Sequence, residues 1–139
     1  MRFLKYLPLF FICFLHAQEE VIHSVYFEFD KFSLKPEQLK GVIDFIQTTD
    51  STRIESIEIF GYCDDRGKDA YNFKLSQNRA NTIQEEFIKN GITNKVIVTI
   101  EGKGRIMIDD DVAENLPEVR SKNRRVDVVL NLKPLPKIQ

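Results

Sequence analysis

The stretch at residues 61–80 reads GYCDDRGKDAYNFKLSQNRA, and it runs from the end of a predicted strand into a predicted helix. It places carboxylates directly after the strand and the guanidinium of Arg79 two turns into the helix. The carboxylate of Asp64 can accept hydrogen bonds as a bare acceptor, and the planar guanidinium of Arg79 can donate several in a fork. An ammonium pairs with a carboxylate and a carboxylate with a bidentate donor, so the pair predicts a site for the amino-acid head of a ligand. Helix N-terminal amides near Asn72 would also favour the carboxylate of the ligand.

The same charges have a structural alternative. Asp64 and Arg79 could simply pair with each other, while Asp65 and Asp69 serve as turn and capping residues. The charge pattern by itself leaves both interpretations open.

Four segments have the pattern of strands. Val21–Asp30 alternates Val25, Phe27 and Phe29 with polar neighbours, which predicts a half-buried strand. Ile54–Gly61 is rich in Ile and closes at a glycine, as a mostly buried strand does before a turn. The remaining two predicted strands are Lys95–Gly102 and Arg124–Leu132.

Two segments have the pattern of helices. Ser33–Thr49 has Pro36 near its start and apolar residues at spacings of three and four. Asn72–Asn90 has the same periodicity, and the following Gly91 supplies the left-handed stop that helices often use. Lys103–Asn123 is polar, and we expect it to be irregular. The order strand, helix, strand, helix, strand, loop, strand predicts one sheet with both helices packed on it.

The first residues predict an exported protein. Met1–Ala17 begins with basic residues, continues with the apolar run Leu7–Leu15 and ends at a small residue, as a secretory signal peptide does. The apolar run is about half of the roughly 20 residues that span a bilayer. We therefore expect a signal peptide at Met1–Ala17, one domain at Val21–Leu132 and a flexible tail at Lys133–Gln139.

The two cysteines bear on how the protein is attached. Cys13 lies inside the apolar run and would leave with the signal peptide, so the exported domain keeps Cys63 alone, which we expect to be buried and inert. The bulky Ile12 before Cys13 disfavours lipidation, because processing needs a small residue there. A lipidated Cys13 and a retained leader remain open alternatives.

Charge and composition exclude several classes of function. Removing the leader leaves 18 basic residues against 21 acidic ones, interleaved along the chain, so nucleic acid is not an expected partner. His23 is the remaining histidine, and no Ser, Cys or carboxylate lies at a telling spacing from it. We therefore expect no enzyme and no catalytic residue. Zinc would need more His or Cys ligands, and no motif predicts another metal or a cofactor.

Residues 61–80 resemble the signature of the OmpA C-terminal family. That signature is a glycine, an aromatic residue or His, a Thr or similar residue and an Asp, followed by a Gly, Tyr-Asn, Leu-Ser and Arg-Ala. The matching residues here are Gly61-Tyr62-Cys63-Asp64, Gly67, Tyr71-Asn72, Leu75-Ser76 and Arg79-Ala80. Three further segments are similar to the family in the right order, namely Val25–Glu37, Asn90–Ile92 and Lys122–Val126.

The resemblance implies an α+β fold, a βαβαββ sandwich with a mixed four-stranded sheet and helices packed on one face. It also implies non-covalent binding to peptidoglycan through the diaminopimelate group of the stem peptide, where Asp64 takes the ammonium and Arg79 the carboxylate. The other implied lining residues are Asp30, Asn72 and Arg124, with Leu75 as an apolar wall. The expected location is the periplasm, or the periplasmic side of the outer membrane, after export.

Cys63 departs from the family pattern. It replaces the usual hydroxyl residue beside the key acid, and a thiol is a poorer hydrogen-bond donor. A second interpretation therefore stays open, in which the domain keeps the fold but docks an outer-membrane or periplasmic protein and binds peptidoglycan weakly or not at all.

Overall fold

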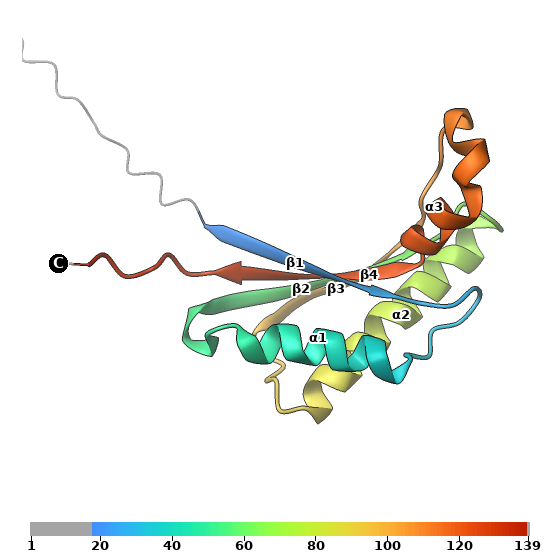
Figure 1. The fold of residues 1–139 in the computed structure, drawn as a ribbon. Coiled ribbons are helices and arrows are strands. Elements are labelled where there is room, and N and C mark those ends of the chain that lie inside the picture. The colour runs from blue at the N-terminus through green and yellow to red at the C-terminus, as the bar shows by residue number, and fades with distance from the viewer. Residues whose placement is uncertain (1–17, 139) are drawn as a thin grey trace, which may run out of the picture.

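Four strands form one mixed sheet in the computed structural model, which describes residues 18–138 (Figure 1). Along the chain the elements are β1 (Glu19–Tyr26), α1 (Pro36–Thr48), the 3-10 turn η1 (Ser51–Arg53), β2 (Ile54–Cys63), α2 (Asp69–Lys89), β3 (Ile97–Arg105), the 3-10 turn η2 (Asp110–Asn115), α3 (Leu116–Asn123) and β4 (Arg125–Leu132).

The strand order is β1-β4-β2-β3, so the last strand of the chain lies between the first and the second. β4 is antiparallel to both β1 and β2, whereas β2 and β3 are parallel. A parallel pair needs a long crossover, and α2 provides it. The predicted α+β fold with a mixed four-stranded sheet is therefore confirmed.

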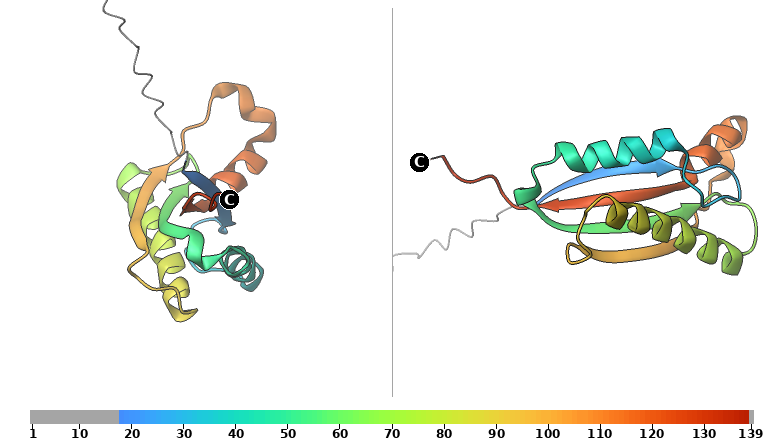
Figure 2. Two further views of the ribbon diagram at one scale, coloured as in Figure 1. Left: turned by 90° about the vertical axis from the view of Figure 1, so that its left-hand side faces the viewer. Right: turned by 90° about the horizontal axis from the view of Figure 1, so that it is seen from below.

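One face of the sheet carries the core. α1 and α2 both cover that face (Figures 1 and 2). The strands contribute alternate apolar side chains and the helices contribute residues one turn apart, as their two periodicities require. Fully buried members of this core are Val25, Val42, Ile57, Ile59, Ile83, Phe87, Val126, Val128 and Leu130.

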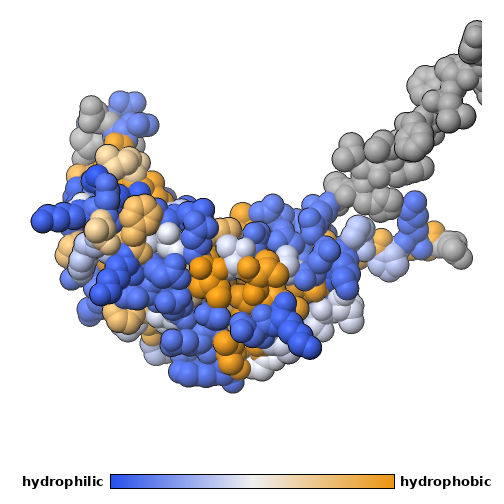
Figure 3. Space-filling model, turned by 180° about the vertical axis from the view of Figure 1, so that it is seen from behind, coloured by the Kyte–Doolittle hydropathy of each residue, from blue (hydrophilic) through white to orange (hydrophobic). Residues whose placement is uncertain are grey.

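The other face of the sheet is largely polar. Ser24 donates to Asp127 at 2.7 Å, and Asp127 also pairs with Arg125 at 2.9 Å. The Arg125 guanidinium lies 4.7 Å from the centre of the Tyr62 ring. Elsewhere apolar side chains reach the surface, and a view from behind shows them gathered near the middle of the molecule (Figure 3).

The first strand is shorter than its alternating pattern predicts. Val25 and Phe27 are buried as expected, but β1 ends at Tyr26, and Phe29 is 56% exposed. Asp30 has a φ of 59°, which is left-handed backbone that an extended strand cannot continue through. The predicted strand Val21–Asp30 is therefore too long, and Phe29 does not lie on the buried face that the alternation assigns to it.

The predicted third strand also differs in detail. β3 runs from Ile97 to Arg105, and its pairing with β2 skips Val98, which is 60% exposed. A bulge of this kind turns a side chain away from the face that strict alternation assigns to it.

The segment Lys103–Asn123 is not irregular throughout. It contains the end of β3, the turn η2 and the helix α3, which stands at one end of the sheet (Figure 1). α3 buries none of its residues, so it has no apolar periodicity that the sequence could reveal.

The second helix begins three residues earlier than predicted, at Asp69, and its predicted end is confirmed. Gly91 has a φ of 86°, and the amide of Ile92 donates to the carbonyl of Phe87 at 3.0 Å, which closes the last turn.

The predictions for the two ends of the chain, a signal peptide and a flexible tail, remain expectations. The predicted signal peptide and Cys13 lie outside the described residues. The predicted tail has no helix or strand at Lys133–Ile138, but the Lys133 amide donates to the Arg53 carbonyl at 2.7 Å. Within residues 18–138, none of the helices combines the length and the apolar character that crossing a membrane requires.

Candidate ligand-binding site

Three strand ends meet beside the start of α2. Tyr26 at the end of β1 pairs with Arg125 at the start of β4, and Gly61 near the end of β2 pairs with Val126. Because β4 is antiparallel to both neighbours, the loops that leave β1 and β2 and the turn that enters β4 lie at one edge of the sheet.

A cavity of about 110 Å³ lies at this edge. All six residues that the sequence singled out line it, namely Asp30, Asp64, Asn72, Leu75, Arg79 and Arg124. The structure therefore brings together residues from four separate segments of the chain.

Two glycines let α2 approach the sheet closely here. Gly61 of β2 and Gly102 of β3 pair side by side beneath the helix. A Cβ at Gly61 would collide with the carbonyl oxygen of Ser76, and one at Gly102 would collide with the amide of Gln77. Only glycine permits this packing, which carries Arg79, one turn beyond Ser76, to the end of β2.

Asp64 is not the bare acceptor that the sequence predicts. Its side chain is 5% exposed, and it accepts from the guanidinium of Arg66 at 2.8 and 3.2 Å and from the Arg66 amide at 3.1 Å. Arg124 Nη1 lies 3.5 Å away on its other side. Burial would raise the pKa of the Asp64 carboxyl, but these hydrogen bonds outweigh it and the pKa is lowered. Asp64 is therefore a charged group between two guanidinium groups.

Arg79 is buried, at 1% exposure, and donates mainly to backbone. Nε donates to the carbonyl of Lys31 at 2.8 Å, Nη1 to that of Tyr62 at 2.9 Å, and Nη2 to that of Glu28 at 3.1 Å. Burial lowers the pKa of its guanidinium. The Arg79 guanidinium therefore has fewer donors available for a ligand than the sequence suggests, because its hydrogen bonds hold the loop after β1 against the end of β2.

The alternative of a direct pair between Asp64 and Arg79 is not formed. Asp64 pairs with Arg66 and Arg124, whereas Arg79 makes no ion pair with any carboxylate of residues 18–138. The site therefore contains a buried cation without a paired counter-charge, an arrangement that is costly unless a ligand or a neighbouring field compensates it.

Asn72 and Leu75 shape the cavity. The Asn72 amide nitrogen donates to the carbonyls of Arg66 at 2.8 Å and Lys68 at 3.1 Å, and so closes the loop before α2. Gly67 in that loop has a φ of 94°, which disfavours other residues. Leu75 is 8% exposed and presents the apolar wall that the resemblance implied.

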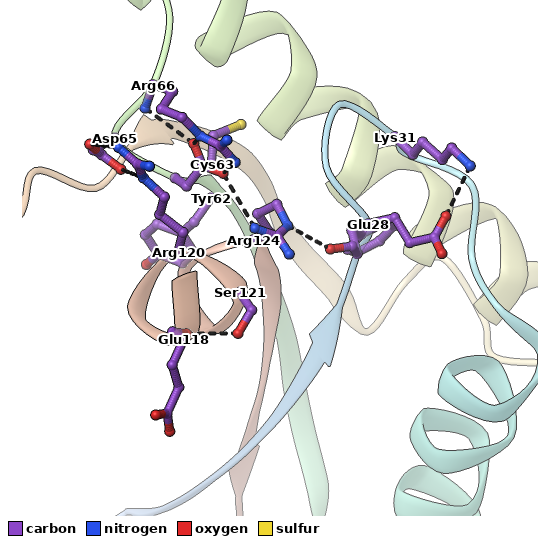
Figure 4. Close-up of polar contacts among 12 residues, drawn as sticks. Glu28, Lys31, Tyr62, Cys63, Asp65, Arg66, Glu118, Arg120, Ser121 and Arg124 are labelled. Carbon is purple, nitrogen blue, oxygen red and sulfur yellow. Dashed lines mark hydrogen bonds and ion pairs between the residues drawn. The ribbon is translucent and has the colours of Figure 1, made fainter. Parts of the chain in front are cut away.

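Asp30 and Arg124 close the side nearest to β1. The Tyr71 hydroxyl donates to the Asp30 carboxylate, and this bond raises the pKa of Tyr71. Arg124 donates from Nε to the carbonyl of Phe27 at 3.1 Å while it reaches Asp64 with Nη1. Figure 4 shows Arg124 between the strand that leads to Glu28 and the loop that carries Arg66.

Sequence reasoning missed Arg66. Its guanidinium lies 4.1 Å from the centre of the Phe29 ring and is bonded to Asp64, so both side chains line the cavity. The two-residue spacing from Asp64 to Arg66 is typical of an Asx turn and could have indicated the contact. The next acid, Asp65, pairs with Arg120 of α3 at 2.8 Å (Figure 4), which ties that helix to the loop.

Cys63 is buried, as expected for an inert thiol. Its Sγ donates to the carbonyl of Asn72 at 3.4 Å and accepts from Arg79 Nη1 at 3.6 Å. Burial raises the pKa of the thiol, so it stays protonated and the buried Arg79 gains no thiolate as a counter-charge. Among the described residues, no group of three or more His, Cys, Asp or Glu side chains could hold a metal ion.

Known proteins share this architecture. Residues 26–124 match the model of the OmpA family. The chain is 36% identical over 106 residues to outer membrane protein A of Bordetella avium, which covers 76% of this chain and 53% of that protein. It is 33% identical over 96 residues to peptidoglycan-binding protein ArfA of Mycobacterium tuberculosis, which covers 68% and 27%. The chain thus spans about half or less of the length of these relatives.

A solved structure has the same fold. The OmpA-like domain of FopA1 from Francisella tularensis superimposes with a TM-score of 0.65 at 24% identity, covering 87% of this chain and 79% of that one.

Proposed function

Because this chain belongs to the OmpA family, we propose that its domain binds peptidoglycan non-covalently, by holding the free amino-acid end of diaminopimelate on a stem peptide. Two findings support the proposal. The name of the Mycobacterium tuberculosis relative describes it as peptidoglycan-binding. The cavity at the ends of β1 and β2 also gathers a buried acid and a buried guanidinium that do not pair with each other.

The unpaired charge on Arg79 is the observation that carries the proposal. A buried guanidinium that bonds mainly to carbonyls still lacks a counter-ion, and a ligand carboxylate would supply it through charge-assisted hydrogen bonds. Arg124 lines the same cavity and could share that carboxylate, since its Nη2 has no hydrogen bond within residues 18–138.

The ammonium of the ligand would go to Asp64. Arg66 pairs with that carboxylate in the structure, but the Arg66 side chain is 40% exposed and can swing outward. An ammonium has three donors and would replace the guanidinium contacts on the buried acid. The ligand ammonium thus replaces the Arg66 guanidinium at Asp64, and the ligand carboxylate pairs with Arg79.

Co-sedimentation with purified peptidoglycan sacculi tests the proposal. Asp64→Asn removes the charge but keeps an acceptor for the Arg66 amide, and Arg79→Lys keeps the charge but removes the planar fork. Losing one member of a desolvated charge pair with the ligand costs about 2–5 kcal/mol, so the affinity of Asp64→Asn for the sacculi should fall at least about thirtyfold.

Asp69→Asn provides a matched control. Asp69 begins α2, is 67% exposed and pairs with Arg105 outside the cavity, so the variant should be retained like the wild type. Circular dichroism would show that each variant is folded. Equal retention of the folded wild type, Asp64→Asn and Arg79→Lys would refute the proposed function.

A protein-docking scaffold is the second candidate, and one observation favours it. Asp64 is already neutralised within the domain by Arg66 and Arg124, as in a site that has become purely structural. Under this alternative Cys63→Thr, which restores a hydroxyl beside Asp64, would leave the affinity for diaminopimelate unchanged. Crosslinking in cells would then recover an envelope protein rather than peptidoglycan fragments.

We also propose that the domain works in the cell envelope, on the periplasmic side, after removal of residues 1–17. The relative from Bordetella avium is named as an outer membrane protein, which supports this location. Mass spectrometry of the mature N-terminus tests the cleavage, because a start at Gln18, a lipidated Cys13 and a retained leader differ in mass.

A further inference from the structure

A second hollow continues from the candidate site along α2. It has a volume of about 260 Å³ and is lined by Asp30, Phe32, Tyr71, Lys74, Leu75 and Asn78. Three of these residues, Asp30, Tyr71 and Leu75, also line the smaller cavity beside Asp64. The two hollows therefore adjoin and share part of their walls, and we call them together the groove between α2 and the loop that connects β1 to α1.

Hydrogen bonds fix both walls of the groove. The Thr82 hydroxyl donates to the carbonyl of Phe32 at 2.8 Å, which holds the connecting loop against α2. The Tyr71 hydroxyl donates to Asp30 across the groove. Phe32 and Tyr71 remain 50% and 53% exposed, so the groove presents two accessible aromatic rings, of which that of Tyr71 is held by its bond to Asp30.

Two polar side chains on the helical side of the groove have no partner among the described residues. Tyr71, Lys74 and Asn78 lie three, four and seven residues apart and so share one face of α2. Neither the Lys74 ammonium nor the Asn78 side-chain amide makes a hydrogen bond or an ion pair with another residue of the described chain. A cation and an amide therefore project beside apolar walls without internal partners.

A larger hollow on the other side of Arg124 lacks this property. It measures about 510 Å³ and is lined by Lys35 and Lys122 among others. Lys35 pairs with Glu28 at 2.9 Å and Lys122 with Glu118 at 3.0 Å, so both ammonium groups already have carboxylate partners.

We propose that the groove along α2 is a second subsite, which holds the part of the stem peptide next to the diaminopimelate head. Lys74 pairs there with a carboxylate of the peptide, Asn78 bonds its amide groups, and Phe32 and Tyr71 pack against the diaminopimelate methylenes. The inference rests on the proposed function, because the head must first enter the cavity beside Asp64. The walls that the two hollows share and the charge of Lys74, which has no partner among the described residues, favour this occupant.

Isothermal titration calorimetry, which measures the affinity of the domain for each of three ligands, tests the subsite. The ligands are meso-diaminopimelate, the tripeptide L-Ala-γ-D-Glu-meso-diaminopimelate, and the same tripeptide with the D-Glu carboxylate and the L-centre diaminopimelate carboxylate converted to amides. The wild type should bind the acidic tripeptide about two- to fivefold more tightly than the amidated one, the range expected for one solvent-exposed charge pair. Lys74→Ala should abolish that preference and leave the affinity for the amidated tripeptide unchanged.

Lys95→Ala is the control for a general loss of positive charge. Lys95 is exposed, precedes β3 at the opposite end of the sheet and lines neither hollow, so its removal should preserve the preference. Wild-type binding of diaminopimelate without any preference between the tripeptides would overturn the subsite alone. Absence of binding of all three ligands would instead refute the proposed function.

Discussion

Arg66 stands where the ligand ammonium is expected, so removing it should tighten binding while it weakens the fold. Arg66→Ala deletes two guanidinium contacts to Asp64, at 2.8 and 3.2 Å, and the contact with the Phe29 ring at 4.1 Å. The backbone amide of residue 66 would keep its own bond to Asp64. The carboxylate stays buried and negative, and it lacks its main partner until a ligand arrives.

The magnitude follows from the exposure of the two groups. Hydrogen bonds to a charged group contribute about 1.5–3 kcal/mol when they are buried. The Arg66 side chain is 40% exposed, and screening by water reduces its contribution to about 1 kcal/mol. We expect Arg66→Ala to lose about 1–2 kcal/mol of unfolding free energy once the lost contact with Phe29 is included. The same interaction no longer opposes the ligand, so diaminopimelate should bind about fivefold more tightly.

The assay pairs urea denaturation with calorimetric titration of meso-diaminopimelate at pH 7. Arg105→Ala is the control, because it removes a guanidinium from the exposed Asp69 at the start of α2, outside the cavity. It should leave the affinity unchanged. If Arg66→Ala binds the ligand with equal or lower affinity, Arg66 does not compete with the ammonium and the reasoning is wrong.

The pH dependence gives a second check on the same variant. The folded pKa of Asp64 is lowered, so its pairing stabilises the wild type above the unfolded value of 3.8 and is lost as the pH falls through the folded pKa. The stability difference between wild type and Arg66→Ala should therefore be complete at pH 6 and should shrink in acid to the part that the contact with Phe29 contributes. A difference as large in acid as at pH 6 would assign the whole effect to packing.

Two further predictions concern the scaffold. Gly61→Ala should destabilise the domain by about 3 kcal/mol or more because its Cβ meets the Ser76 backbone, whereas Gly41→Ala in α1 meets nothing closer than 3.8 Å and should stabilise it by about 0.5–1 kcal/mol in urea denaturation. Burial lowers the pKa of His23, which stacks on Phe45 at 4.9 Å. Stability should therefore be present above pH 6.5 and fall as the pH drops below it, and His23→Phe should lose this slope in thermal melts between pH 7.5 and 5.

The sequence predicted the elements that bury a regular face. Alternation placed Val25 and Phe27 in the core, and helical spacing placed Ile83 and Phe87 there. The helix α3 escaped prediction because it buries no residue and is tied to the domain by a long-range pair, Arg120 with Asp65. Such a contact leaves no local pattern.

The list of site residues was predicted, but the roles of two of them were not. The resemblance to the OmpA family, now confirmed by the family match, named six positions that the fold brings into one cavity. It could not show that Arg66 forms an ion pair with Asp64. Nor could it show that Arg79 donates its hydrogen bonds to the backbone carbonyls of Glu28, Lys31 and Tyr62. Whether the six positions bind diaminopimelate stays a prediction.

Local periodicity by itself determined the order of the four strands and of the two helices that bury a face, and the resemblance to the OmpA family added the mixed sheet and the residues that gather at its edge. Only the tertiary structure decided which charges meet, because the partners lie up to 60 residues apart, as Asp64 and Arg124 do. The carbonyl partners of Arg79 likewise depend on the packing of the loop after β1 against α2. Side-chain interactions between sequence neighbours on a helix act over about one turn. The partners of a buried guanidinium are set instead by the packing of the whole domain.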